Sequence, residues 1–393
     1  MHVVYVTPDF IDNMGPTTGL PKYLFKAAST LVEWGHKVTV ITCSNRTVNY
    51  MFYGINVYRL RRPNVVKYGD QEKDTYIDCY RDGYILNQQL HELYKNEHID
   101  IIQYASLFGI GSYHDLPVPA VMRLSSYACM WPVKGREIAQ NTLALMERKA
   151  AERCNAIFGP SYVVAKQFQN DVKKRVDVIE TPFVMEEVDE DRTIYDSKFK
   201  GKKYFLFFGK LIEYKGLTVI EKVVYDILSH ISDLSIAIVG DGDIKLVDKI
   251  LIQAQEYRDR VIYNSAIGFG QLKPIIENAQ FVVLPSIMEN FSNACVEAMA
   301  LGQIVIGTDG VSFEQLIADG VSGLLCKPDD VDSLKKKIFE ALSLSEEEKM
   351  LMRKNAKKRI EKLSPNYVIR DLLNYYEQVI DCYTVSESMK VFL

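Results

Sequence analysis

Short apolar runs alternate with longer amphipathic segments along most of the chain. In the first half, the runs that we expect to be strands lie at residues 3–7, 37–42, 56–61, 100–103 and 118–124. Segments with helical spacing separate them, at residues 21–34, up to about residue 96, and at residues 137–153 and 162–175. This alternation predicts strands that lie parallel in a sheet, with helices on its faces.

The second half repeats the pattern. Its expected strands lie at residues 204–208, 235–239, 261–264, 281–284 and 304–306, and its expected helices at 217–230, 269–278, 292–301, 331–342 and 346–363. A charged run at residues 186–203 suits a linker and surface arm between the two halves. A chain of 393 residues is long enough for two domains of ordinary size. We therefore expect an α/β protein with two domains.

One stretch of the second half, residues 281–310, combines a strand, a polar loop, a helix and a strand. The loop carries Glu289, and Ser292 stands where it can cap the helix. Glu297 follows inside the helix. In parallel sheets ligands gather at the carboxyl ends of the strands, and the first turn of a helix attracts anions such as phosphate. The interpretation without a function is that both glutamates are solvated at a helix end. Sugar and ribose hydroxyls are also suitable hydrogen-bond partners for them.

A second cluster follows the strand at 204–208. Lys210 and Lys215 stand five residues apart, and Gly209 and Gly216 flank them. Two cations at the carboxyl end of a strand suit a diphosphate. The alternative is a pair of surface lysines before a helix.

Together these motifs resemble the donor-binding signature of retaining glycosyltransferases of family 4, which have the GT-B fold. The signature is Glu-x7-Glu followed by Ala-Met-Ala-x-Gly, and it is matched from Glu289 through Glu297 to Gly302. The family pattern Gly-Arg/Lys-x4-Lys-Gly is matched by residues 209–216. The resemblance is specific over residues 204–330 and looser over residues 1–180.

The resemblance implies a role for each matched residue. Lys210 and Lys215 would neutralise the departing diphosphate, and Glu289 would contact the donor sugar near the reacting carbon, so these three are the catalytic candidates. Glu297 would bind the ribose hydroxyls. The remaining donor-binding candidates are backbone positions, namely Gly19, Gly209, Gly240, Gly242, Ile267, Phe291, Ser292 and Asn293.

Five of these positions match the family or depart from it in a specific way. Gly240 and Gly242 match the family's Val-Gly-x-Gly turn, and Ile267 lies in the loop where family members hold the nucleobase by backbone atoms. Where many members have glycine this chain has Ser292, which narrows the backbone freedom but keeps the amide. In the loop at residues 8–20 only Gly19 carries over from the family's Gly-Gly, with Lys22 as an added contact, and a structural turn is the equal alternative.

The chain departs from the family at the end of the strand at 118–124. Many members have a histidine there, whereas this sequence has Arg123, followed by Ser125 and Ser126. These three residues become candidates for contact with the donor or the acceptor. For the two serines a helix cap or a turn is an equally good interpretation.

By resemblance, the fold is two Rossmann-like domains that face each other across a cleft, with a C-terminal helix that crosses back to the first domain. The boundaries would be residues 1–182 with 366–393 for the acceptor-side domain and residues 183–365 for the donor-binding domain. The activity would be transfer of a sugar from a nucleotide-diphospho-sugar to a glycan or a lipid-linked acceptor with retention of configuration, in the synthesis of cell-surface polysaccharide or glycoconjugate. UDP is favoured over GDP by family frequency alone. No metal and no other cofactor is expected, because the lysine pair stands in for a cation.

Composition and charge narrow the setting. The net charge of −4 argues against a nucleic-acid partner. Residues 1–180 carry 21 basic and 18 acidic side chains, a balance of +3 that favours contact of the N-terminal domain with anionic membrane only weakly. The seven scattered cysteines suit reduced thiols, and no apolar run reaches the length of a membrane span. We expect a cytoplasmic protein, with peripheral binding to the inner face of the membrane as an option.

Three other functions stay open. One is a nucleotide-sugar epimerase on the same fold, and another is a phosphorylase that uses pyridoxal phosphate. The third is a non-catalytic partner that binds a sugar nucleotide for another transferase. The absence of the family's histidine leaves this alternative open. Absorbance near the cofactor band tests for the phosphorylase, and the non-catalytic partner would bind the donor without turnover.

Overall fold

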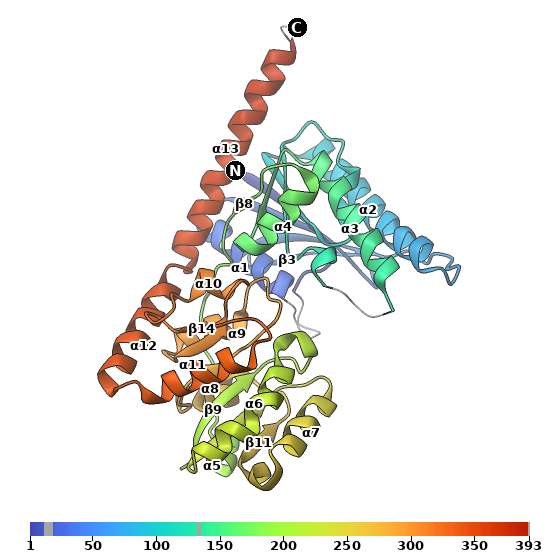
Figure 1. The fold of residues 1–393 in the computed structure, drawn as a ribbon. Helices are drawn as coiled ribbons and strands as arrows, with labels where there is room; N and C mark the ends of the chain where they lie inside the picture. The colour runs from blue at the N-terminus through green and yellow to red at the C-terminus, as the bar shows by residue number, and fades with distance from the viewer. Residues whose placement is uncertain (12–18, 132–134, 392–393) are drawn as a thin grey trace. The chain divides into compact units, whose positions relative to one another are not determined.

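The computed structural model describes residues 1–11, 19–131 and 135–391, and the chain forms two compact units (Figure 1). The N-terminal unit comprises Met1–Pro182 together with Pro365–Leu393, and the C-terminal unit comprises Phe183–Ser364. Each unit is built around one sheet with helices on its faces, so the predicted α/β class is confirmed.

The N-terminal sheet has the strand order β3-β4-β2-β1-β5-β6-β7-β8. Its strands are β1 (His2–Thr7), β2 (Lys37–Ser44), β3 (Val48–Phe52), β4 (Ile55–Arg61), β5 (Ile101–Ala105), β6 (Ala120–Arg123), β7 (Ala156–Gly159) and β8 (Asp177–Val178). All neighbouring strands are parallel except β3 and β4. The sequence did not predict the β3–β4 hairpin, whose turn places Tyr53 and Gly54 at positive φ.

Helices cover this sheet. They are α1 (Gly19–Glu33), α2 (Gln71–Asn96), α3 (Glu137–Arg153), α4 (Tyr162–Val172) and α13 (Pro365–Val391), with short 3₁₀ turns η1 (Leu107–Tyr113) and η2 (Ala128–Met130). The sequence predicted that α4 runs to residue 175, but it ends earlier because Lys173 takes a left-handed conformation with φ of 54°. The helix α13 packs against α1, which confirms the predicted return of the C-terminal helix to the first unit.

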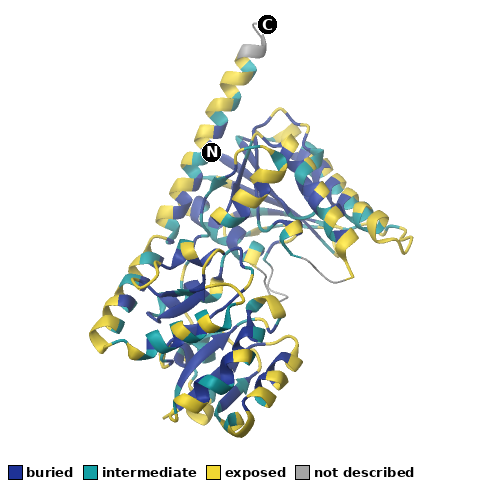
Figure 2. Cartoon of the chain, viewed as in Figure 1, coloured by how far each residue is buried: buried dark blue, intermediate teal, exposed yellow. Residues whose placement is uncertain are grey.

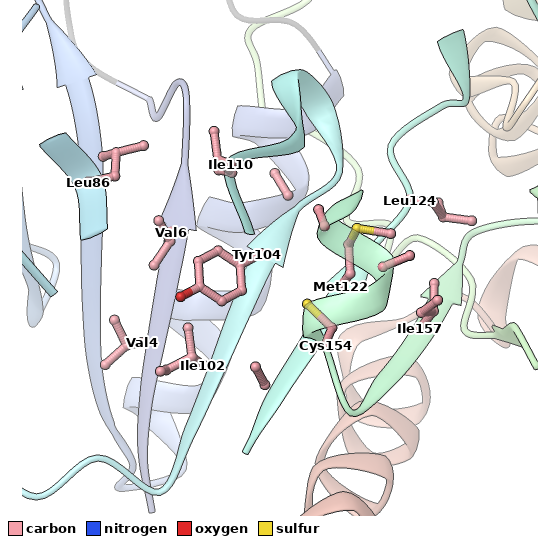
Figure 3. Close-up of a cluster of buried hydrophobic side chains, with 14 of the residues drawn as sticks. Val4, Val6, Leu86, Ile102, Tyr104, Ile110, Met122, Leu124, Cys154 and Ile157 are labelled. Atoms are coloured by element: carbon pink, nitrogen blue, oxygen red, sulfur yellow. The ribbon is translucent and has the colours of Figure 1, made fainter. Parts of the chain in front are cut away.

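The core of the N-terminal unit lies on both faces of its central strands. Every residue of β1 and β5 is buried, as expected for parallel strands that are covered on both sides. Figure 3 shows Val4, Val6, Ile102 and Tyr104 from these two strands beside Met122 of β6. The apolar runs that predicted strands are therefore the centre of the unit.

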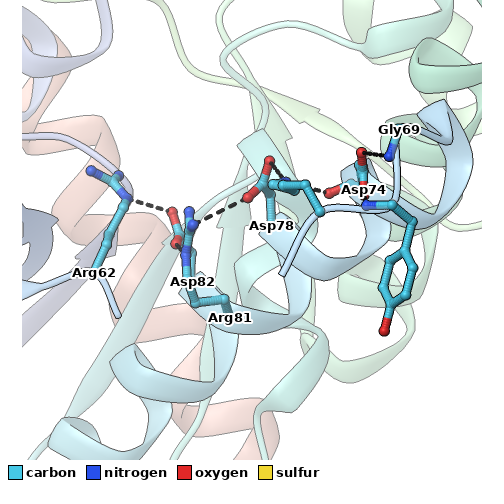
Figure 4. Close-up of polar contacts among 8 residues, drawn as sticks. Arg62, Gly69, Asp74, Asp78, Arg81 and Asp82 are labelled. Atoms are coloured by element: carbon cyan, nitrogen blue, oxygen red, sulfur yellow. Dashed lines mark hydrogen bonds and ion pairs between the residues drawn. The ribbon is translucent and has the colours of Figure 1, made fainter. Parts of the chain in front are cut away.

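A chain of ion pairs fastens α2 to the sheet (Figure 4). Asp82, which is 3% exposed, accepts from Arg62 Nε at 2.9 Å and from Arg81 Nε at 2.7 Å. Arg62 also donates through Nη2 to the carbonyl of Pro8 at 2.8 Å. The same side chain thus holds α2 and the start of the loop that follows β1.

The C-terminal sheet is parallel throughout, in the order β11-β10-β9-β12-β13-β14. Its strands are β9 (Lys203–Phe208), β10 (Leu234–Val239), β11 (Val261–Asn264), β12 (Val282–Val283), β13 (Val305–Thr308) and β14 (Leu324–Cys326). Its helices are α5 (Thr193–Lys198), α6 (Leu217–His230), α7 (Ile244–Gln253), α8 (Phe269–Glu277), α9 (Asn293–Ala300), α10 (Phe313–Leu316), α11 (Val331–Ser343) and α12 (Glu346–Glu361), with the 3₁₀ turns η3 (Glu213–Lys215) and η4 (Gln255–Arg260).

Burial follows the predicted pattern in this unit as well. Figure 2 shows buried strands, and the helices expose mainly their outer faces. The strand–loop–helix–strand unit predicted over residues 281–310 is β12, α9 and β13, and β12 pairs with β13 in parallel. The charged run predicted as a linker differs in one respect, because it contains the short helix α5.

Candidate functional site

The strand order of the C-terminal sheet has a switch point between β9 and β12. From β9 the chain proceeds to β10 and β11 on one side, and from β12 it proceeds to β13 and β14 on the other. The loops that leave the adjacent strands β9 and β12 therefore diverge at the carboxyl edge, and in open α/β sheets ligands bind at such a point. Lys210 and Lys215 follow β9, and Glu289 follows β12.

The structure joins two of these residues directly. Lys215 Nζ donates a hydrogen bond to Glu289 Oε2. The side chain of Glu289 is only 8% exposed, and that of Lys215 is 26% exposed. A carboxylate this far from water needs a compensating charge, and the ammonium supplies it. The pair thus places a cation and an acid from two different loops at one point.

The main chain brings the same two loops together. The amide of Ile287 donates to the carbonyl of Tyr214 at 2.9 Å. Gly216 has φ of +82°, and a Cβ there would lie 1.9 Å from the carbonyl oxygen of Pro285. Only glycine allows this approach. The contact between the loops is therefore fixed by backbone as well as by the ion pair.

Lys210 differs from Lys215. Its side chain is exposed, and within the part of the chain that the structure describes no carboxylate lies within 4.0 Å of its ammonium group. Its neighbour Leu211 is bridged to Gly242 in the loop after β10. Lys210 therefore lies just after the carboxyl end of β9, with its charge available to an anion.

The glycines of the β9 and β10 loops pack against each other. A Cβ on Gly240 would lie 1.8 Å from the carbonyl oxygen of Gly209, and one on Gly242 would lie 2.4 Å from that of Leu211. The sequence predicted that these glycines allow a ligand to approach, whereas the structure gives them a role in packing between loops. Gly209 itself, with φ of +137°, has open space where its Cβ would be. Whether a ligand fills that space stays a prediction.

The helix α9 begins as predicted. Ser292, which is 4% exposed, caps it by accepting a hydrogen bond from the amide of Cys295 at 3.3 Å. Phe291 is half-buried and Asn293 is exposed at the start of the helix. The first turn of α9 carries the partial positive charge of the helix dipole and lies directly after the Glu289 loop.

The remaining donor-binding candidates lie on the same edge or on α9. Glu297 is half-buried on α9, one to two turns from Ser292. Ile267 is half-buried in the loop after β11. That loop is tied to the β10 loop, because Asp241 Oδ1 accepts from the amide of Ala266 at 2.9 Å and the carbonyl of Gly240 accepts from Tyr263 at 3.2 Å.

Two features of this edge were not predicted from the sequence. The contact between Lys215 and Glu289 could not be read because strand order is not visible in a pattern of apolar runs. After β13, Asp309 and Glu314 lie close together, and their hydrogen bond raises the pKa of Glu314. The signal for this second pair was present as two acidic residues beside Gly310, whose amide donates to Glu314 Oε1.

The candidates of the N-terminal unit surround a buried guanidinium. Arg123 ends β6 and is 4% exposed, with its guanidinium carbon 3.5 Å from the ring centroid of Tyr23. It donates to Ser125 Oγ at 3.3 Å and to Thr181 Oγ1 at 3.2 Å. Burial lowers the pKa of Arg123 from its ordinary value. These contacts give Arg123 a packing role, and its contact with a donor or acceptor stays a prediction.

The backbone groups of Ser125 and Ser126 are bound by the side chain of Ser106. Ser106 Oγ accepts from the amide of Ser125 and donates to the carbonyl of Ser126, both at 3.3 Å. Gly19 is exposed as the first residue of α1, and Lys22 is half-buried on that helix. The predicted glycine loop lies mostly in residues 12–18, outside the described residues. The donor-binding role of Gly19 stays a prediction.

In residues 1–11, 19–131 and 135–391, no helix is both long and apolar enough to cross a membrane. Over the same ranges, no three histidine, cysteine, aspartate or glutamate side chains are grouped so that they could bind a metal ion.

The fold and the edge described above define a class of protein. Two Rossmann-like parallel sheets, with the last helix returning to the first unit, make a GT-B-like fold. Residues 189–359 match the family model described as Glycosyl transferases group 1. The matched segment contains the β9 lysines, the Glu289 loop and α9, which confirms the resemblance seen in the sequence.

Relatives and solved structures agree with this assignment. The chain is 24% identical over 176 residues to the 2-deoxystreptamine N-acetyl-D-glucosaminyltransferase of Niallia circulans, covering 45% of each chain. Among solved structures, the sucrose-phosphate synthase of Thermosynechococcus elongatus has a TM-score of 0.74 at 18% identity, covering 97% of this chain and 100% of that one. Anabaena HepE in complex with UDP has a TM-score of 0.72 at 15% identity, covering 96% and 100%. At these identities the structures show the fold alone.

The curated matches are partial. The chain spans about half the length of the first curated relatives it matches, 48% and 45%. The shared part, 177 and 176 residues, is about the length of one unit.

Proposed function

We propose that the protein is a retaining glycosyltransferase that transfers a sugar from a nucleotide-diphospho-sugar without a metal ion. The observation that supports this most directly is the meeting of cations and a buried acid at the point where the C-terminal sheet changes direction. Lys210, Lys215 and the first turn of α9 all present positive charge there. A diphosphate is the ligand whose charge this arrangement matches best.

The roles follow from the geometry. Lys210 has no acidic partner among the described residues and binds the diphosphate of the donor, which it stabilises as the leaving group. Lys215 holds Glu289 in place when no donor is bound, and its ammonium then shares its hydrogen bonds between the acid and the diphosphate. Glu289 faces the sugar and stabilises the positive charge that develops at the reacting carbon. Glu297, further along α9, accepts hydrogen bonds from the ribose.

The donor we favour is a UDP-sugar, and the acceptor is a glycan or a lipid-linked group in a pathway of polysaccharide or glycoconjugate synthesis. UDP is supported by its presence in the similar structure of Anabaena HepE. The relative from Niallia circulans is named a 2-deoxystreptamine N-acetyl-D-glucosaminyltransferase, which supports transfer of a sugar by this chain. The N-terminal unit is the acceptor side in this proposal.

Contact with an anionic membrane would use the N-terminal unit. The helix α2 exposes Tyr76, Tyr80 and Tyr84, each more than 40% accessible and four residues apart. Tyrosine side chains of this kind favour the boundary between water and lipid. The test is flotation with vesicles that contain phosphatidylglycerol, where a Tyr80→Ser and Tyr84→Ser double variant should lose binding. Equal flotation of the variant and the wild type would remove this part of the proposal.

Turnover tests the main proposal. Purified protein is incubated with a panel of UDP-sugars and GDP-sugars, and release of the nucleoside diphosphate is measured with and without EDTA. We expect release from one nucleotide class, unchanged by EDTA and reduced in Lys210→Ala. The matched control is Lys249→Ala, which removes an exposed lysine of α7 that is not a candidate site residue.

Two results would contradict the proposal. If a folded protein bound the sugar nucleotide but released nothing from any donor, a non-catalytic binding partner would be the better conclusion. If EDTA abolished release, the lysines would not stand in for a metal ion.

A further inference from the structure

A basic hollow lies on the C-terminal unit at the carboxyl end of α9. It has a volume of about 660 Å³. It lies between the residues that end α9 and the C-terminal half of α12. Four cations of α12 line it, namely Arg353, Lys354, Lys357 and Lys358. The carboxylates of Glu277 and Glu361 are the acidic groups of its lining, so the net charge of the lining residues is positive.

These four cations are not engaged by acids. Over the described residues, no carboxylate lies within 4.0 Å of any of them. Two other basic residues of the same helix do have partners. Lys349 pairs with Glu346 at 2.8 Å, and Arg359 donates to the carbonyl of Gln315 at 2.9 Å. The lack of partners is therefore a property of the hollow rather than of the helix.

Two buried polar atoms at the hollow also lack partners. Gln303 is 3% exposed, and its Nε2 donates to the carbonyl of Glu277 at 2.8 Å, which leaves its Oε1 buried without a hydrogen bond. Arg353 Nε is likewise buried without an acceptor. Buried polar groups in native proteins are nearly always satisfied. One unpaired acceptor and one unpaired donor thus lie in the wall of the same hollow.

The backbone makes room for one of the cations. Gly302 has φ of +79°, and a Cβ at this position would lie 2.4 Å from Lys357 Cε and 3.2 Å from its Nζ. The absence of a side chain lets the end of Lys357 lie against the turn after α9. The exposed side chain of Lys357 therefore passes close to this turn at the hollow.

From these observations we propose that the hollow binds a small phosphorylated ligand that also carries hydroxyl groups. A phosphate accepts charge-assisted hydrogen bonds from several cations at once, including the unpaired Nε of Arg353. A hydroxyl donates to the unpaired Oε1 of Gln303. A ligand with both groups satisfies every unpaired atom described above.

This site is separate from the proposed donor site. The donor site uses the first turn of α9, whereas the hollow lies after its last residue. The helix has eight residues, so its ends are about 12 Å apart at about 1.5 Å per residue. A ligand in the hollow is therefore additional to the sugar nucleotide, and the proposal does not depend on the activity proposed above.

The first experiment measures binding of glycerol 3-phosphate to the full chain by calorimetry, in the wild type and in Lys210→Ala. Binding that persists in Lys210→Ala is not binding at the proposed donor site. We expect the double variant Lys354→Gln and Lys357→Gln to bind at least about tenfold more weakly, because each lost charge-assisted hydrogen bond contributes on that order. The matched control, Lys245→Gln with Lys249→Gln on α7, makes the same change of charge and should bind like the wild type.

A second arm separates a free phosphate ester from a lipid headgroup, since both carry the same chemistry. Vesicles of phosphatidylglycerol are compared with vesicles of phosphatidylcholine, using the same two double variants. Soluble binding that only the hollow variant loses assigns the site to a metabolite, and vesicle binding that only this variant loses assigns it to a headgroup. If neither probe binds, or if both variants behave alike, the proposal is overturned. Thermal melting of each variant establishes that it is folded.

Discussion

At the scale of single residues, the pairing of Lys215 with Glu289 is the feature that the sequence did not contain. The motifs assigned one residue to the phosphate and the other to the sugar, and both assignments came from position in a signature. The structure shows that the two side chains are in contact before any ligand is considered. Because Glu289 is buried, its charge requires that cation, and any donor has to share it.

This coupling gives a prediction for Glu289→Gln. The variant keeps the shape of the side chain but removes its charge, so Lys215 is released to the diphosphate. UDP should then bind at least as tightly as to the wild type, while release of UDP from a UDP-sugar falls by at least about 100-fold, in line with loss of an electrostatic group in an active site. Calorimetry with UDP and a turnover assay give the two values.

The opposite pattern would contradict this view of the pair. If UDP binding weakened in Glu289→Gln while turnover per bound donor stayed the same, Glu289 would act in nucleotide binding rather than at the sugar. A Glu213→Gln variant is the control, since it removes an exposed acid from the neighbouring 3₁₀ turn.

At the scale of helices and strands, much of the fold was predictable because parallel strands are continuous apolar runs. The helix α6 was predicted over its full length, Leu217–His230. The end of α4 was missed because Lys173 takes a left-handed conformation that lysine rarely favours. The cap of α9 by Ser292 was predicted because a serine before a helix has a specific hydrogen-bonding role.

Contacts within the site were harder to foresee than its elements. The packing of Gly240 against Gly209 depends on two loops meeting from adjacent strands, which the sequence does not reveal. The same holds for Arg123. Its position in the sequence predicted a contact with a ligand, whereas the structure places its guanidinium over the ring of Tyr23. Motif positions were visible, whereas the partners of each side chain were not.

The packing of α3 makes stability depend on pH through Glu147. This residue is 1% exposed and accepts from the amide of Ala128 at 2.9 Å. Burial raises the pKa of Glu147 to about 8 from an ordinary value of 4.5, although the amide and Arg148 act in the opposite direction. In the folded protein the carboxyl group therefore keeps its proton at a pH where the unfolded chain has lost it.

The sign of the effect follows from the number of bound protons. Between about pH 4.5 and 8 the folded state binds more protons than the unfolded state at this residue, so its contribution to the free energy of unfolding falls as the pH rises. Above about pH 8 the loss levels off. We expect Glu147→Gln, which keeps the acceptor for Ala128, to remove this slope in denaturation measured from pH 5 to 9. A slope that is unchanged in the variant would show that another group causes it.

At the scale of the whole molecule, the chain builds its N-terminal unit from both of its ends. The buried Tyr376 of α13 donates to Gln103 Oε1 at 2.5 Å, which ties the last helix to β5. The C-terminal unit, in contrast, is one continuous segment with its own sheet. The family match at residues 189–359 lies wholly within that segment.

This asymmetry predicts different behaviour for the two halves when they are expressed separately. Residues 183–364 should fold alone and bind UDP, because the lysines, Glu289 and α9 all belong to this segment. Residues 1–182 should be unstable, because α13 no longer covers the sheet. Circular dichroism with thermal melting, and calorimetry with UDP, test the two fragments. A folded 183–364 fragment without affinity for any nucleoside diphosphate would show that the donor site requires the N-terminal unit.

The most direct measurement is calorimetric binding of UDP and GDP to the full chain, compared among the wild type, Lys210→Ala and Lys249→Ala. Lys210 contributes a charge-assisted hydrogen bond in our proposal, which is worth about 1.5–3 kcal/mol, or about 10-fold to 100-fold in affinity. We predict that one nucleotide, UDP, binds the wild type and the Lys249→Ala control alike, and binds Lys210→Ala more weakly by that factor. Equal affinity of all three proteins for UDP, or no binding of either nucleotide to folded wild-type protein, would contradict the placement of the donor diphosphate at the carboxyl ends of β9 and β12.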